Sequence, residues 1–224
     1  MTRRRIWFVL LCLLVLPLIA AYAGGWAVIT LDDLPAQLPT GQPVDLAFTV
    51  RQHGMTPVTD LHPVVTARSG DRDTRAAALP AGKPGRYAAR LTVPRDGDWR
   101  ITIDSDFGDS RVTLLPIRAS AATASNGNGN GATHAAPPRE RGRQLFVAKG
   151  CITCHVHGDI GDARSLAVGP DLSERRFAAD YLGMFLADPS IRPPTGDNRM
   201  PDLDLSQAEI NALVAFINAE RPRR

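Results

Sequence analysis

Lysine, cysteine and aromatic residues are all scarce in this chain of 224 residues. Lys83 and Lys149 are its only lysines, so arginine supplies nearly all of the positive charge. Residues 24–118 carry 11 acidic and 11 basic side chains, residues 119–224 carry 12 of each, and the net charge of +3 therefore comes from three arginines near the N-terminus. Seven Phe, three Tyr and three Trp leave few side chains that could stack on bases. We therefore expect no nucleic-acid partner.

The shortage of cysteine limits how the chain can be cross-linked. Cys12 lies in an apolar N-terminal segment, and the remainder of the chain contains only Cys151 and Cys154. No disulfide framework can therefore stabilise the long N-terminal half, which must fold around an apolar core.

The first 23 residues have the features of a secretory signal peptide. Arginines at positions 3–5 precede an apolar stretch over residues 6–20, and Ala21-Tyr22-Ala23 has the small-x-small form of a cleavage site. The alternative is an uncleaved membrane anchor, because the apolar stretch could continue to Ile29 and span a bilayer. Both interpretations predict export to the periplasm or to the outer face of the cytoplasmic membrane, with possible membrane association through the N-terminus.

A change of composition divides the exported part into two. Residues 118–138 contain an Asn-Gly repeat flanked by Ala, Ser and Thr, a composition that cannot bury a core and predicts a flexible linker. The segments on either side, residues 24–117 and 139–224, are each long enough for one small domain. We therefore expect a two-domain protein.

Residues 24–117 have the pattern of an all-β domain. Apolar and polar side chains alternate over residues 43–50, 86–93, 98–103 and 110–115, and Gly- or Pro-containing turn sequences lie between these segments. A period of two indicates half-buried antiparallel strands. Short strands at this spacing predict a β-sandwich of about seven strands.

Three segments of this half resemble the YtkA-like family of exported immunoglobulin-type domains. They are "GQPVDLAFTVRQHG", "PVTDLHPVV" and "GRYAARLTVPRDGDWRITID", and the resemblance covers residues 26–117. It implies an immunoglobulin-like sandwich that serves as a binding or assembly module of the cell envelope rather than as an enzyme.

Residues 139–224 have the pattern of an all-α domain. Helices are predicted over residues 137–150, 177–189 and 205–220. The last is the clearest, because Ser206 and Glu209 form a capping box and apolar residues follow at positions 210, 213, 214 and 217.

The segment "KGCITCHVHG" contains the two remaining cysteines and two histidines. A structural zinc site would need Cys151, Cys154, His155 and His157 as its four ligands, but the adjacent Cys154 and His155 could hardly both face one ion. A thioredoxin-type redox pair requires a βαβ context that is missing here. A covalent haem accounts for every residue, because two thiols three apart can bond the two vinyl groups and the next residue, His155, can ligate the iron.

The second axial ligand should lie downstream of His155, and the candidates are Met184, Met200, His157 and a water. His157 is too close to the proximal histidine to reach the opposite haem face, and Met184 lies in mid-helix, where methionine more often packs in a core. Met200 lies in an irregular, proline-rich stretch before the last helix, where a thioether can point at the iron. We predict Met200 as the second axial ligand.

Residues 139–224 also resemble a class I cytochrome c domain. The matching segments are "GRQLFVAKGCITCH", "GPDL" and "RMPDLDLSQAEINALVAFI". The resemblance implies one covalent haem c on Cys151 and Cys154 with His155 and Met200 as axial ligands, and a hydrogen bond from the His155 Nδ1 to the Pro170 carbonyl. It further implies that Gly142 and Phe146 pack against the last helix near Leu213 and Phe216.

One candidate metal site lies in the β-domain. His53, Met55 and His62 occur within ten residues, and His and Met are ligands that suit copper in an exported protein. The alternative is a loop in which the two histidines form local hydrogen bonds.

These observations predict an electron carrier rather than an enzyme. The β-domain would dock the haem domain to a respiratory oxidase or dehydrogenase, and the linker would let the haem domain move between partners. The alternative is a copper-handling or oxidase-assembly factor whose haem supplies or senses electrons. A third possibility is an enzyme in which Met200 is displaced, but no catalytic base can be identified near the haem.

Overall fold

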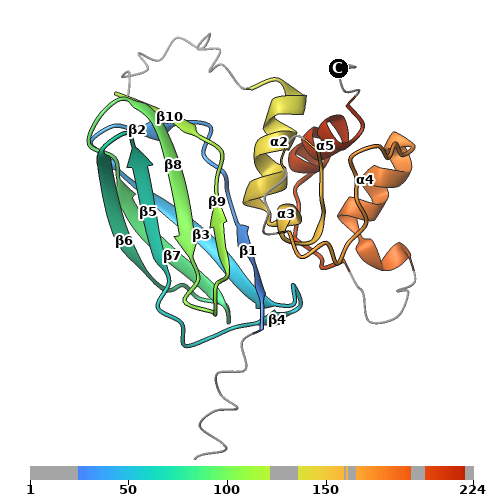
Figure 1. The fold of residues 1–224 in the computed structure, drawn as a ribbon, viewed down its shortest axis with the longest axis horizontal. Coiled ribbons are helices and arrows are strands. Elements are labelled where there is room, and N and C mark those ends of the chain that lie inside the picture. The colour runs from blue at the N-terminus through green and yellow to red at the C-terminus, as the bar shows by residue number, and fades with distance from the viewer. Residues whose placement is uncertain (1–24, 122–135, 159, 161–164, 193–199, 220–224) are drawn as a thin grey trace, which may run out of the picture.

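The computed structural model describes residues 25–121, 136–158, 160, 165–192 and 200–219. It contains a β-rich N-terminal region and a helical C-terminal region side by side (Figure 1), which confirms the predicted fold class. The predicted signal peptide and most of the predicted linker lie outside the described residues. No helix within the described ranges is long and apolar enough to cross a membrane.

The β-region is one hydrogen-bonded sheet that curls into a half-barrel. Within the described residues the strand order is β1-β3-β7-β6-β5-β8-β10-β2, with β4 paired to β3 and β9 paired to β8. The strands are β1 (Ala27–Leu31), β2 (Leu38–Pro39), β3 (Pro43–Gln52), β4 (Thr56–Pro57), β5 (Val64–Ser69), β6 (Arg72–Pro80), β7 (Arg86–Thr92), β8 (Gly97–Asp104), β9 (Arg111–Thr113) and β10 (Ile117–Ser120). The first part of β6 pairs with β5 and its last three residues pair with β7, so β6 connects the two halves of the sheet.

The alternating segments of the sequence form the core as predicted. Leu46, Phe48 and Val50 of β3 are buried, and the inward side chains of β8, including Trp99 and Ile101, are fully buried. Because strand side chains alternate between faces, the positions between these residues lie on the outer face, and most of them are polar, such as Thr49 and Arg100. The sequence DSDFGDS, whose first residue ends β8, connects β8 and β9 in a hairpin.

Ten strands lie in the described part of the chain, rather than about seven. β1 shows no alternation because all five of its residues are buried. β6 is rich in alanine and arginine, and its Leu79 is 69% exposed, so its sequence gives little strand signal. β10 extends to Ser120, three residues beyond the boundary that the sequence suggested for the β-domain.

The helical region contains α2 (Pro138–Ala148), α3 (Cys151–Cys154), α4 (Ala179–Ala187), the short 3-10 helix η1 (Pro189–Ile191) and α5 (Gln207–Ile217). The predicted contact between α2 and α5 is present. A Cβ on Gly142 would collide with the main-chain oxygen of Ala212, and the rings of Phe146 and Phe216 lie 5.6 Å apart. The capping box of Ser206 and Glu209 at the start of α5 is also present.

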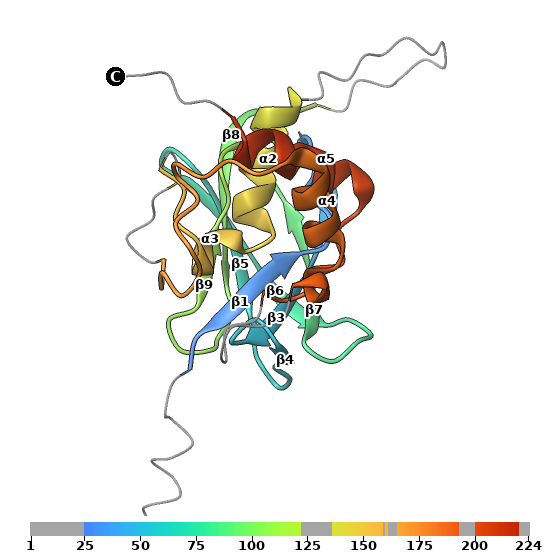
Figure 2. The same cartoon turned by 90° about the vertical axis from the view of Figure 1, so that its right-hand side faces the viewer.

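The two regions pack against each other where α2 meets β9 and β1 (Figures 1 and 2). Arg141 Nη2 donates a hydrogen bond of 2.6 Å to the Leu34 carbonyl, and Lys149 Nζ donates one of 2.6 Å to the Asp32 carbonyl. Both carbonyls lie just beyond the end of β1. These contacts do not agree with the expectation that the helical domain moves freely on a tether.

Candidate haem site

The two cysteines lie on α3, a single helical turn that follows α2 directly. Gly150 separates the two helices, and its φ of 79° allows the sharp change of direction that glycine adopts readily. Cys151 and Cys154 are three residues apart, so both thiols project from the same side of the turn. Burial raises the pKa of Cys151 to about 12 and that of Cys154 to about 11, so both are present as neutral thiols in neutral solution.

His155 follows α3 and has a fixed ring orientation. Its main-chain N–H donates to the Cys151 carbonyl, and its Nδ1 lies 2.9 Å from the carbonyl oxygen of Pro170. A carbonyl can only accept, so Nδ1 carries the proton and Nε2 presents a lone pair. Desolvation lowers the pKa of His155, partly opposed by the Pro170 hydrogen bond, so the ring is held in the neutral form that binds metals.

Gly169 completes the support of this ring. A Cβ at position 169 would lie 2.5 Å from Cε1 and 2.6 Å from Nδ1 of His155, closer than any real contact. The N–H of Gly169 also donates a hydrogen bond of 2.9 Å to the Cys154 carbonyl, so the Gly169–Pro170 segment is tied to α3. Pro170 was predicted from the GPDL motif, whereas the role of Gly169, the first residue of the same motif, was not.

The structure places the candidate second ligands in different surroundings. Met200 is half-buried and packs against the hydrophobic core, directly after residues that lie outside the described part of the chain. Met184 is 58% exposed on α4. His157 is buried, with its ring centroid 4.3 Å from that of Phe216 and 5.9 Å from that of Phe146, so it belongs to the aromatic core between α2 and α5.

The candidate copper residues have separate neighbours. The ring of His53 lies 5.1 Å from that of Trp26, whereas His62 Nδ1 lies 3.4 Å from a carboxylate oxygen of Asp106 at the surface. Met55 is 48% exposed. Among the residues that the structure describes, no three or more His, Cys, Asp and Glu side chains form a metal-binding group. Copper binding by His53, Met55 and His62 stays a prediction.

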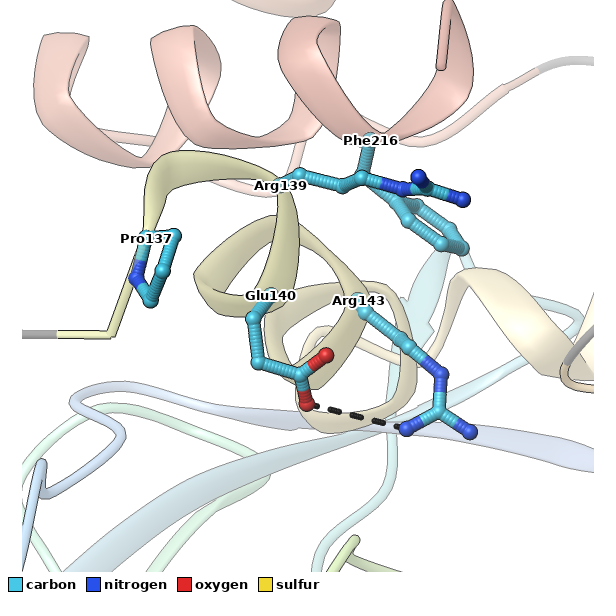
Figure 3. Close-up of a pocket in the computed structure, with 5 residues that line it drawn as sticks. All are labelled: Pro137, Arg139, Glu140, Arg143 and Phe216. Atoms are coloured by element: carbon cyan, nitrogen blue, oxygen red, sulfur yellow. Dashed lines mark ion pairs between the residues drawn. The ribbon is translucent and has the colours of Figure 1, made fainter. Parts of the chain in front are cut away.

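Two surface pockets lie elsewhere on the helical domain. One, of about 450 Å³, lies beside α2, where Arg143 and Glu140 form an ion pair of 3.6 Å (Figure 3). The other, of about 490 Å³, is lined by residues of α4 and α5, including Met184 and Val214. Neither is lined by Cys151, Cys154, His155 or Met200, so the chemistry of the side chains locates the candidate site and the pockets do not.

The helices, the paired thiols and the oriented imidazole all lie in the part of the chain that matches a known family. Residues 139–219 match the family model of cytochrome c. This match supports a helical cytochrome c domain that follows the β-region in the sequence. The family implies covalently bound haem c. No curated protein matches the chain.

Solved structures give only distant likenesses. A proposed glycoside hydrolase from Bacteroides vulgatus has 16% identity, covers 40% of this chain and gives a TM-score of 0.31, and the chain spans 17% of its length. A superoxide reductase (neelaredoxin) from Ignicoccus hospitalis has 13% identity over 45% of this chain and 85% of its own, with a TM-score of 0.29. The ZirS C-terminal domain has 18% identity over 42% of this chain and 65% of its own, also with a TM-score of 0.29. We draw no conclusion from similarities this weak.

The residues present fit a covalent haem. Cys151 and Cys154 offer two uncommitted thiols on one turn, and neither is in a disulfide. His155 offers an imidazole whose Nδ1 is already tied to Pro170, which leaves Nε2 to coordinate. The absence of a side chain at Gly169 keeps the space that this ring needs.

Proposed function

We propose that this protein is an exported electron carrier with one haem c. Cys151 and Cys154 would attach the haem through thioether bonds, and His155 and Met200 would be its axial ligands. The main support is the hydrogen bond between the His155 Nδ1 and the Pro170 carbonyl, next to two thiols on one helical turn. Such a group, when bound with both axial positions filled, supplies one-electron transfer and no open site for a substrate.

The chain's own residues would set the properties of the iron. The Pro170 carbonyl would fix the plane of the His155 ring and make its Nε2 a stronger donor, an effect that outer hydrogen-bond partners generally have on metal ligands. Burial lowers the pKa of that ring, which favours its neutral form. A thioether from Met200 would favour the reduced iron and raise the reduction potential relative to a second histidine.

The proposed location follows from the N-terminal segment, and the proposed partners follow from the haem domain. The N-terminal segment would direct the protein to the periplasm or to the outer face of the cytoplasmic membrane. There it would exchange electrons with redox proteins such as a respiratory oxidase or dehydrogenase. The β-domain would present the haem domain to such a partner as an immunoglobulin-type module.

The test is the visible spectrum of the full chain produced together with haem-maturation machinery. We expect one haem that stays attached under denaturing conditions, a low-spin ferric spectrum with the far-red methionine-to-iron band, and no carbon monoxide binding after reduction. Met200→Ala should abolish the far-red band, whereas Met184→Ala should retain it. A high-spin spectrum or ready carbon monoxide binding by the parent protein would contradict the proposed electron carrier and favour catalysis or gas sensing.

A further inference from the structure

The β-domain contacts the segment that carries the cysteines and His155. A Cβ on Gly150 would lie 2.5 Å from Cγ1 of Val28 and 2.7 Å from the main-chain oxygen of Ile29. Val28 and Ile29 belong to β1, which is buried along its whole length. The turn that starts α3 therefore rests directly on the main chain of this strand.

A second part of the β-domain contacts the segment that carries Met200. A Cβ on Gly54 would lie 3.2 Å from Cγ of Pro201, the residue that follows Met200, and 3.5 Å from Cγ2 of Val28. Val28 thus lies between Gly150 on one side and Gly54 on the other, and Pro201 packs against the same turn.

The turn that contacts Pro201 is held by main-chain hydrogen bonds. His53 and Gly54 have φ angles of 51° and 76°, and Met55 N–H donates a hydrogen bond of 3.0 Å to the Gln52 carbonyl. Positive φ at these two successive residues reverses the chain between β3 and β4, whose pairing of Gln52 with Thr56 leaves three residues in the loop. The His53 N–H also donates to the Trp26 carbonyl at 3.0 Å, which ties the turn to the chain leading into β1.

Beyond the far end of β1, buried polar contacts also hold the β-domain to the helices. Lys149 is 2% exposed, and its ammonium group is bonded both to the Asp32 carbonyl and to the carboxylate of Glu209. Arg141 donates to the Leu34 carbonyl from the preceding part of α2. The β-domain therefore meets the helical domain at several separate places.

We propose that the β-domain is an intramolecular buttress for the haem site, in which the turn Gln52–Met55 positions Met200 through Pro201. This inference rests on the proposed function, since it requires that Met200 ligates the iron. Gly54 is then a positioning residue, because it acts on the ligand through its neighbour. The turn that the sequence suggested as a copper site would instead limit how far the Met200 segment can move from the iron.

Two glycine substitutions in the full-length holoprotein separate this role from ordinary backbone strain. Gly54→Ala and Gly82→Ala both place a side chain at a positive φ, 76° and 82° respectively. The Cβ at position 82 meets nothing within 4 Å, whereas that at position 54 meets Pro201. The two variants should be destabilised to a similar extent by the backbone, but only Gly54→Ala should push on the Met200 segment.

The readout is the binding of imidazole to the ferric protein, which displaces the methionine and removes the far-red band. We expect Gly54→Ala to bind imidazole about tenfold more tightly than the parent, the equilibrium effect of one overpacked methyl group. Gly82→Ala should bind like the parent. Combining Gly54→Ala with Pro201→Ala should restore much of the parent behaviour, because the added methyl group then meets a smaller neighbour.

Equal imidazole affinities for Gly54→Ala and Gly82→Ala, in a parent protein that shows the far-red band, would overturn the buttress and leave the electron carrier intact. A parent protein without the far-red band would overturn both, because no methionine ligand would then exist to position. If Gly54→Ala fails to fold, Pro201→Gly provides the second test. It removes the same contact from the other side and should also raise the imidazole affinity.

Discussion

The ammonium group of Lys149 lies 2.7 Å from the Oε1 atom of Glu209, and this ion pair is enclosed between the two domains. The side chain of Lys149 is 2% exposed and that of Glu209 is 16% exposed, so neither charge is well solvated. One residue further on, the chain turns at Gly150 into the helix that carries the cysteines. The pair therefore joins α5, the end of α2 and the end of β1 next to the helix that carries the cysteines.

Removing the lysine should strongly destabilise the folded chain. Lys149→Met leaves the Glu209 carboxylate buried without its cation and the Asp32 carbonyl without its donor, and breaking a buried pair typically costs about 3–5 kcal/mol. Urea unfolding of the full chain measures this loss. Lys83→Met is the matched control, because Lys83 is exposed and its replacement should change the free energy of unfolding by less than about 0.5 kcal/mol. Equal effects of the two substitutions would show that the pair is not stabilising.

The same pair should make stability depend on pH. Burial disfavours the Glu209 carboxylate, but hydrogen bonds from Lys149 and Ser206 outweigh that effect and lower its pKa. A lowered folded pKa means that the stabilisation is fully present above the unfolded value of about 4.3 and is lost as the pH falls through the folded value. Unfolding measured from pH 6 down to pH 2 should show this decline in the parent. In Glu209→Gln the slope over that range should be smaller, and an unchanged slope would contradict the assignment.

A side chain at position 169 should disturb the His155 ring. The added methyl group of Gly169→Ala cannot occupy the space next to Nδ1, so the hydrogen bond to Pro170 should lengthen or break. The imidazole then becomes a weaker donor, and the reduction potential of the holoprotein should rise by on the order of 50 mV, the equivalent of one hydrogen bond. Electrochemical titration measures this shift. Gly183→Ala is the control, since its Cβ would meet only Ile210 at 3.9 Å, and its potential should stay at the parent value.

Close approach of α2 and α5 predicts a further loss of stability. Gly142→Ala directs a methyl group into the main chain of Ala212 and the side chain of Phe216, and because backbone cannot easily move aside the cost should be about 3 kcal/mol. Thermal unfolding of this variant beside Gly183→Ala gives the comparison. A melting temperature for Gly142→Ala as high as that of Gly183→Ala would mean that the helices can separate without loss.

Much of the architecture could be predicted because local signals agreed with it. The alternation of β3 and β8, the capping box of Ser206 and Glu209, and the CxxCH sequence each depend on neighbouring residues only. β1 was not predicted because both of its faces are buried. Helices cover the face that would otherwise be polar, so its five residues show no alternation of apolar and polar side chains. That burial depends on residues more than 100 positions away, such as Lys149.

Some residues of the candidate site could likewise be predicted from local sequence, and others could not. Cys151, Cys154 and His155 are adjacent in sequence, and the partner of His155 followed from a short motif. Lysine is among the residues least often buried, so nothing in the sequence marked Lys149 as an interior group. The contact of Gly54 with Pro201 joins two turns from different domains, and no local pattern could have revealed it.

The position of β1 also bears on how the isolated N-terminal half would behave. Within the described sheet β1 pairs only with β3, and it packs against α2 and against the Gly150 turn that precedes α3. A fragment ending after β10 would uncover the sequence AVITL as an apolar edge strand without charge or proline. Such edges recruit other strands and aggregate. By covering β1, the helical domain therefore also prevents self-association through this strand. Truncation before α2 should give a fragment that precipitates at concentrations where the whole chain stays in solution.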